Sequence, residues 1–180
     1  MRRLVLVVLS MGVLAQGTAA AEGNGTLAKE EAAAIMSAEG RHVRPVDARL
    51  RLAVTDGLRR SATLAHLVLA LDRTDVIVYL ETGTTLHPSL AGRLLMAATT
   101  SGSRYLRVQI APWLRGNELI AIIGHELQHA LEVAHSPGVR DERSLAALYR
   151  TIGHAAEGSH QYDTAAAREA GRQVRSELAG

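Results

Sequence analysis

The feature that most constrains this chain is a pair of histidines within a long uncharged segment. Residues 119–131 have the sequence LIAIIGHELQHAL, which places His125 and His129 at positions i and i+4 with Glu126 between them. In an α-helix these two imidazoles lie on one face, one turn apart, and can converge on one metal ion. Glu126 lies about 100° further around the helix, where it misses the ion but can reach a water bound to it. The spacing predicts a zinc site with a carboxylate general base.

The residues around the pair predict a helix that is buried along one side. With about 100° of rotation per residue, Glu118 and Glu132 fall close to His125 on the helical wheel. Apolar residues gather around the opposite pole: Leu119, Ile120, Ile123, Leu127, Ala130 and Ala134. Such a division is typical of a helix packed on a core, with both histidines on its polar side. The alternative is a helix with two incidental histidines, one of them paired with Glu126 or Glu132.

Residues 122–131, IIGHELQHAL, resemble the active-site helix of the zincin metallopeptidases, with uncharged residues where that family has them. The resemblance is specific over this segment and loose over the rest of the chain. It implies a small twisted sheet over the helix, with an extended substrate added as a strand at the sheet edge nearest the cleft. It also implies hydrolysis of peptide bonds, in which Glu126 takes a proton from a zinc-bound water and passes it to the leaving amine.

A catalytic zinc ion needs three protein ligands, so a residue outside the pair must supply the third. His135 stands at the offset from His125 that the metzincin branch of that family uses, but Glu132 occupies the position where that branch has glycine. Glu132 itself lies on the metal face about 10 Å further along the helix than His125. We therefore expect Glu132 to orient the ring of His129 or to form an ion pair.

The third possibility for the missing ligand is a carboxylate from a later helix, as in the gluzincin branch. Asp163 opens the closing helix and is followed on the same face by small residues that allow close packing: Ala166, Ala167 and Ala170. Glu157 and Glu169 compete with it, and Asp163 would also serve as a helix N-cap. Aspartate is, in addition, shorter than the glutamate usual in that branch. We predict one zinc ion per chain, with the ligands His125, His129 and Asp163.

A proton donor or oxyanion partner is expected to face the metal site. Four residues after the histidine pair are candidates: Tyr149, His154, His160 and Tyr162.

The start of the chain has the pattern of a secretory signal peptide. Arg2 and Arg3 precede an apolar core of about a dozen residues, which ends in an Ala-x-Ala sequence at residues 19–21. The core is too short for a comfortable membrane span. We predict a leader at residues 1–21 and a single domain at residues 22–180. The mature protein is expected in a periplasm or outside the cell, without stable membrane insertion.

Composition narrows the classes of partner. The chain has 20 Lys+Arg and 18 Asp+Glu, and removal of the leader with its two arginines leaves it formally neutral, so no nucleic-acid partner is predicted. Cysteine is absent, which excludes disulfides and a lipid-anchored cysteine. Phenylalanine is also absent, so the core must be built from Leu, Val, Ile, Ala and Met.

The order of predicted elements indicates an α+β fold. The β-branched run at residues 76–80 predicts a strand in the interior of a sheet, and residues 94–99 and 104–111 predict a β-hairpin. Besides the histidine helix, helical spacing predicts helices at residues 27–38, 47–71 (with a possible break at Asp56–Gly57), 141–153 and 163–178. The expected domain has a short sheet of about three strands over the HExxH helix, flanked by helices.

These observations favour an exported zinc-dependent metallopeptidase acting on a peptide or protein substrate. The second hypothesis is a catalytically silent protein of zincin fold that acts by binding in the cell envelope. Glu126 argues against the second hypothesis, because a silent site has little reason to keep its base. A helical interaction protein without metal is the third hypothesis.

Overall fold

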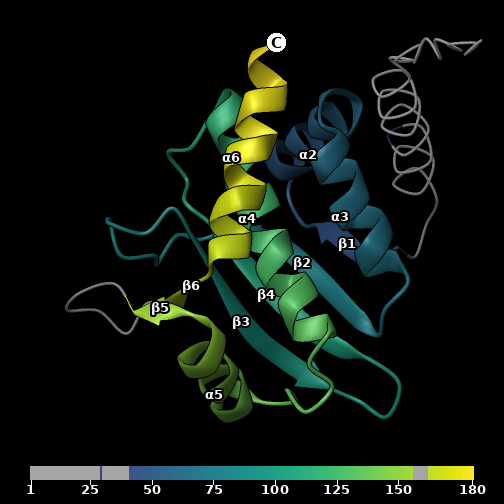
Figure 1. Cartoon of the computed structure of the whole chain (residues 1–180). Coiled ribbons are helices and arrows are strands. Elements are labelled where there is room, and N and C mark those ends of the chain that lie inside the picture. Colours follow the sequence, from purple (N-terminus) through teal and green to yellow (C-terminus); the bar gives the residue numbers. More distant parts are fainter. Residues whose placement is uncertain (1–28, 30–40, 156–161) are drawn as a thin grey trace, which may run out of the picture.

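The computed structural model describes residue 29 and residues 41–155 and 162–180 (Figure 1). The predicted leader at residues 1–21 and, apart from Lys29, the predicted helix at residues 27–38 lie outside the described residues. The described part has an α+β fold with five helices, a four-stranded mixed sheet and a pair of two-residue strands. None of the described helices combines the length and the apolar character needed to cross a membrane.

The four-stranded sheet has the order β1-β2-β4-β3. The central strands β2 (Val76–Thr82) and β4 (Arg104–Ile110) run parallel, and β3 (Gly92–Thr99) pairs antiparallel with β4 to form the predicted hairpin. The expectation of about three strands is wrong, because the segment between the predicted helices at residues 27–38 and 47–71 contains the edge strand β1 (Val43–Pro45), parallel to β2. A strand of this length is too short to show a period in sequence, and proline is tolerated at a sheet edge.

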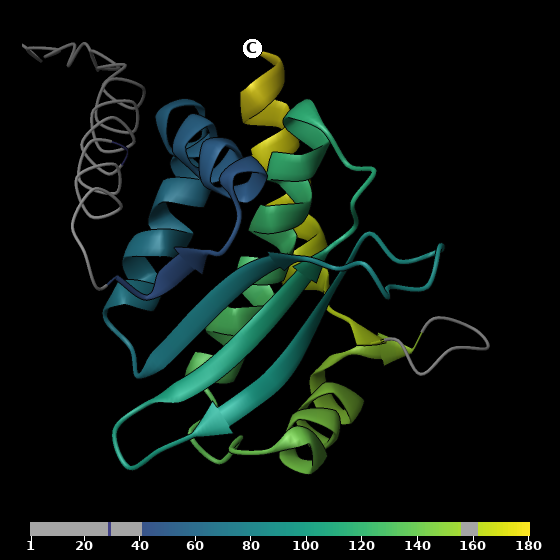
Figure 2. The ribbon, with the colours of Figure 1, turned by 180° about the vertical axis from the view of Figure 1, so that it is seen from behind.

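One face of the sheet is covered by helices, and no described element covers the other (Figure 2). In β2 the side chains of Val76, Val78 and Leu80 are fully buried beneath the helices, whereas Tyr79 on the opposite face is half-buried. The strand is therefore interior to the sheet, as its continuous apolar sequence predicts.

The predicted long helix at residues 47–71 is two helices, α2 (Ala48–Arg60) and α3 (Ala62–Asp72). The break lies at Ser61, whose hydroxyl accepts a hydrogen bond from the backbone N–H of Leu64 and donates one to Glu177. Gly57, where a break was expected, lies inside α2. A Cβ there would come within 2.4 Å of the Leu64 side chain, so this glycine serves the packing of α2 on its neighbours.

The histidine helix is α4 (Gly116–Ala134), which lies between the sheet and the closing helix α6 (Ala165–Ala179) in Figures 1 and 2. Two glycines let α4 and α6 approach closely. A Cβ at Gly124 would lie 2.8 Å from Val174 Cγ2, and one at Gly171 would lie 3.3 Å from His125 Cβ. The small residues of both helices therefore set how near α6 comes to His125.

Helix α5 (Glu142–Ile152) lies beside β3, apart from the other helices (Figure 1). A reciprocal capping box between Asp141 and Ser144 starts it. The strands β5 (His154–Ala155) and β6 (Tyr162–Asp163) then pair antiparallel, with His154 opposite Asp163. This short ladder leads the chain to Asp163 just before α6 begins.

Candidate metal centre

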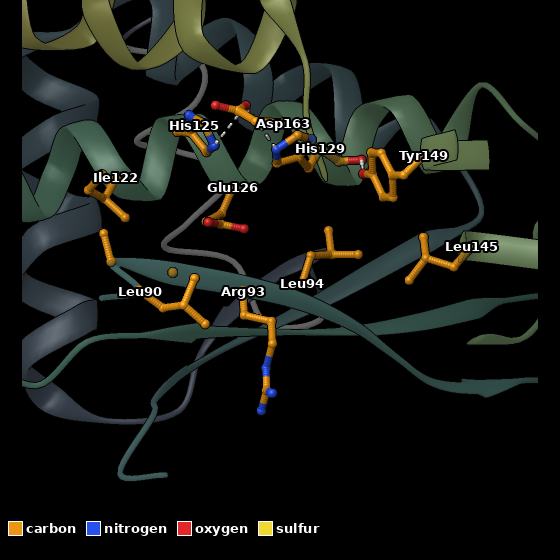
Figure 3. A pocket seen from close by; sticks show the side chains of 12 residues that line it. Leu90, Arg93, Leu94, Ile122, His125, Glu126, His129, Leu145, Tyr149 and Asp163 are labelled. Atoms are coloured by element: carbon orange, nitrogen blue, oxygen red, sulfur yellow. Dashed lines mark hydrogen bonds and ion pairs between the residues drawn. The ribbon is translucent and has the colours of Figure 1, made fainter. Parts of the chain in front are cut away.

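Two elements bring three candidate ligand side chains together. His125 and His129 come from successive turns of α4, with ring centroids 4.9 Å apart and ring planes nearly perpendicular. Asp163, at the end of β6, lies between the two imidazoles in Figure 3. Its Oδ1 atom is 3.5 Å from His125 Nε2 and 3.7 Å from His129 Nε2.

These distances match the spacing of ligand atoms around a tetrahedral ion. Nitrogen and oxygen ligands at about 2.0–2.1 Å from such an ion lie about 3.3–3.4 Å from one another. The ligand atoms of His125, His129 and Asp163 all lie within 4.8 Å of one another. In addition, Asp163 Oδ1 is buried without a hydrogen-bond donor among the described residues, an arrangement that is costly unless a cation binds there. The three predicted residues could hold a metal ion.

Asp163 is not the N-cap of the closing helix. That position belongs to Thr164, whose Oγ1 accepts a hydrogen bond from the backbone N–H of Ala167 at 3.0 Å. The helix begins at Ala165, two residues after its predicted start. The Asp163 carboxylate is thereby free of the capping role that competed with metal binding.

Glu132 holds the ring of His129 in place, as its position on the helix predicts. Its Oε2 is 2.9 Å from His129 Nδ1, and its Oε1 accepts a hydrogen bond of 2.6 Å from the Thr164 hydroxyl. A carboxylate at Nδ1 favours the tautomer with a proton there, which leaves Nε2 free to bind a metal. The same carboxylate therefore joins α4 to the start of α6, next to Asp163.

The other candidates for the third ligand lie elsewhere or outside the described residues. His135 is an exposed C-cap residue of α4, because the helix continues through Glu132 without reversing. Glu169 forms an ion pair with Arg172 on the exposed face of α6. Glu157 lies outside the described residues.

The pKa values of the two histidines shift in opposite directions. Burial and the neighbouring His129 lower the pKa of His125, which favours the neutral imidazole that binds metals. Burial also acts to lower the pKa of His129, but the hydrogen bond with Glu132 and the nearby charges of Glu126 and Glu132 raise it above its ordinary value. Metal binding at this site would therefore compete with protons mainly at His129.

Glu126 lies in the cavity between α4 and β3, facing the strand (Figure 3). Its side chain is buried, and no described residue donates a hydrogen bond to its carboxylate. Burial raises its pKa to about 7, with His129 lowering it and Asp163 raising it further. A carboxylate with a pKa near neutrality can both take and return a proton.

Gly92 makes the room that Glu126 occupies. A Cβ at this position would lie 2.4 Å from Glu126 Oε1, so any other residue would displace the carboxylate. The predicted hairpin began at Leu94, and nothing in the local sequence connects Gly92 with the HExxH segment. Its role depends on the distance between β3 and α4.

Tyr149 lines the same cavity as Glu126 and supports His129. Its hydroxyl donates a hydrogen bond of 3.2 Å to the backbone carbonyl of His129, and its ring meets the imidazole edge to face. Burial raises the pKa of the Tyr149 phenol, so it remains protonated. The side chains of His154 and Tyr162 and the whole of His160, the other candidate donors, lie outside the described part of the chain.

A cavity of about 390 Å³ opens onto Glu126 and the ligands. Arg93 points away from the cavity (Figure 3). Apolar side chains from β3, the segment before it, α4 and α5 form much of the cavity wall: Leu90, Leu94, Ile122 and Leu145. The first arm of the hairpin, β3, is therefore the arm that lines the cleft, and it is also the free edge of the sheet.

Comparisons of this chain with protein-family models, with curated proteins and with solved structures found no match. The chemistry of the site alone must therefore indicate the function.

Proposed function

We propose that this protein is an exported, zinc-dependent metallopeptidase that hydrolyses peptide bonds. One observation carries the proposal. A His125–His129–Asp163 ligand set stands beside a buried carboxylate, Glu126, that no described residue engages in a hydrogen bond. Ligands and base border the same cavity, which is the arrangement that metal-assisted hydrolysis requires.

The ligand set favours zinc among the common divalent metals. Two imidazoles and one carboxylate with an open position are typical of catalytic zinc sites. Calcium and magnesium prefer more oxygen ligands than the three residues offer. When bound, zinc supplies a Lewis acid that polarises a carbonyl group and makes a water molecule more acidic.

The chain's own residues supply the proton transfers. Glu126 accepts a proton from the attacking water while the water oxygen bonds to the carbonyl carbon of the scissile peptide. It then returns that proton to the departing amine as the C–N bond breaks. Its burial and its pKa near 7 suit both steps.

The free edge of β3 is suited to hold an extended peptide. The N–H of Met96 points outward from the sheet, since it donates a hydrogen bond of 2.8 Å to the Glu142 carboxylate. Because backbone groups alternate along a strand, those of Leu94 and Gly92 face the same free edge. A substrate strand added there would place its side chains against the apolar cavity.

Two measurements on the purified mature protein test the proposal. We expect about one zinc ion per chain by elemental analysis, lost in His129→Ala and kept in His135→Ala, a matched change on the same helix. Glu126→Gln should keep the zinc ion and lower cleavage of a peptide library by about 100- to 10,000-fold. Zinc binding without any cleavage would instead support the silent binding protein, and equal zinc content in wild type and His129→Ala would reject the metal site.

A further inference from the structure

A second groove adjoins the metal centre on its other side. It lies between α4 and α6, has a volume of about 350 Å³ and shares Ile122 and His125 with the first cavity. The two hollows therefore meet at a metal ligand. A peptide bound across the centre would pass from one to the other.

The wall of this groove on α6 is strongly basic. Arg168, Arg172 and Arg175 stand at positions i, i+4 and i+7 of α6, so they lie along one face of the helix. Between them Gly171 lies close to His125, where a Cβ would be 3.3 Å from His125 Cβ. The arginines are therefore held near the metal ligand by the close packing of the two helices.

The positive charge of the groove is only partly neutralised by the protein itself. Arg172 pairs with Glu169, and Arg175 forms two hydrogen bonds of 2.8 Å with Glu118. Arg168 makes no side-chain hydrogen bond or ion pair with any residue that the structure describes. Exposed ion pairs are weak and compete poorly with a well-placed ligand. The groove therefore has three guanidinium groups that can bind an anion, and only two carboxylates that compete for them.

We infer that the α4–α6 groove binds a carboxylate of the substrate. The inference rests on the proposed function and adds a substrate class to it, namely peptides with an acidic group on one side of the scissile bond and an apolar residue on the other. Guanidinium groups bind carboxylates through paired, charge-assisted hydrogen bonds. Arg168 is the main contact, because it is the arginine of this groove that has no partner among the described residues.

The carboxylate has two possible sources, an Asp or Glu side chain or the C-terminus of the peptide. Binding measurements on the zinc-loaded Glu126→Gln protein separate them without any turnover. Four fluorescent peptides of one sequence are compared by anisotropy, with Glu or Gln at the varied position and a free or amidated C-terminus. We expect the preferred acid to bind roughly tenfold more tightly than its neutral counterpart at low salt.

Variants of the groove decide whether the arginines cause that preference. Arg168→Gln should reduce it to less than about twofold, and Arg168→Glu should make the protein prefer a lysine-containing peptide. Arg59→Gln is the matched control, since Arg59 on α2 also forms an exposed i,i+3 ion pair, with Asp56. It should leave the preference unchanged. Equal binding of acidic and neutral peptides, or an equal loss in Arg59→Gln, would overturn the inference.

The failure of this inference is distinguishable from failure of the proposed function. Zinc binding and cleavage without a preference for acidic peptides would reject the groove alone. An acid preference that depends on Arg168 in a protein without zinc or cleavage would support the groove as an anion site and reject the peptidase.

Discussion

Two polar clusters lie along α4, and they differ in how completely their atoms are paired. One surrounds Arg104 at the C-terminal end of the helix, and the other comprises His125, His129, Asp163 and Glu126 at its middle. Both contain charged side chains that are largely removed from water. Such groups are destabilising unless partners satisfy them.

The cluster at the helix end is satisfied. The Arg104 side chain is 2% exposed and forms two hydrogen bonds with the Asp75 carboxylate, at 2.8 and 2.7 Å. Its remaining donors bind backbone carbonyls at and beyond the end of α4: Val133, Ala134, Ser136 and Val139. Arg104 thereby fixes the C-terminus of α4 to the start of β4.

The cluster at the middle of the helix is not satisfied. Among the described residues, none donates a hydrogen bond to the buried Oδ1 atom of Asp163 or to the Glu126 carboxylate. We propose that the fully paired cluster holds the structure and that the incompletely paired cluster binds a ligand. The four predictions that follow test this division, beginning with the largest expected effect.

Removal of the Asp163 carboxylate should separate metal binding from folding. We expect Asp163→Asn to weaken zinc binding by well over about 100-fold, the upper range for groups that only orient a ligand. The metal-free protein should be no less stable, because the lost carboxylate oxygen has no donor and Thr164 caps α6. Chelator competition and thermal unfolding measure the two effects. Unchanged zinc affinity would place the third ligand elsewhere.

Removal of Arg104 should have the opposite pattern. Arg104→Met leaves Asp75 and several carbonyls without a donor, so the free energy of unfolding should fall by about 3–5 kcal/mol. Zinc bound per folded molecule should stay the same. Denaturant unfolding measures the change, with Arg59→Met as an exposed control that alters stability by less than about 0.5 kcal/mol. A stable Arg104→Met protein without zinc would reverse the roles of the two clusters.

Removal of the Glu132 carboxylate should have an intermediate effect, since Glu132 contacts the candidate ligand His129 but is not itself one of the three candidate ligands. Glu132→Gln should weaken zinc binding by about 10- to 100-fold, because the amide orients His129 less strongly than the carboxylate does. Chelator competition again measures the effect. A loss as large as that of Asp163→Asn would mean that Glu132 binds the metal directly.

The Arg104 cluster should also respond to acid. The hydrogen bond from Arg104 lowers the pKa of Asp75 below its ordinary value of 3.8. The stabilisation by this carboxylate is therefore complete above about pH 4 and is lost as the pH falls through the lowered pKa. Asp75→Asn should flatten the acid dependence of unfolding below pH 4, by a modest amount because Asp75 is 43% exposed. An unchanged slope would show that the Arg104–Asp75 pair does not contribute to the acid dependence of stability.

Local sequence was sufficient to predict the elements whose pattern lies within a few helical turns or within one hairpin. The spacing of His125, Glu126 and His129 and the apolar stripe opposite them predict α4 with both histidines on one face, and alternation predicts the β3–β4 hairpin. Helical spacing did not predict that His129 and Glu126 are buried. Glu132 was also placed correctly, since it lies one turn from His129 on the same helix. Short-range geometry determines these features.

Features that depend on one contact between distant segments could not be predicted in the same way. β1 exists because residues 43–45 pair with β2, and the Ser61 hydroxyl between α2 and α3 donates a hydrogen bond to Glu177 of α6. The sequence favoured Asp163 among several acidic candidates. It could not decide whether Asp163 would instead cap the closing helix, a role that Thr164 has in the structure.

The sequence by itself determined which groups one helix presents together, namely two imidazoles and a carboxylate. Only the tertiary structure decided which acidic residue joins them, which hairpin arm lines the cleft, and that Gly92 makes room for Glu126. The physical reason is that helical spacing fixes distances within α4, whereas the position of Asp163 relative to α4 follows from how closely α6 packs at Gly124 and Gly171.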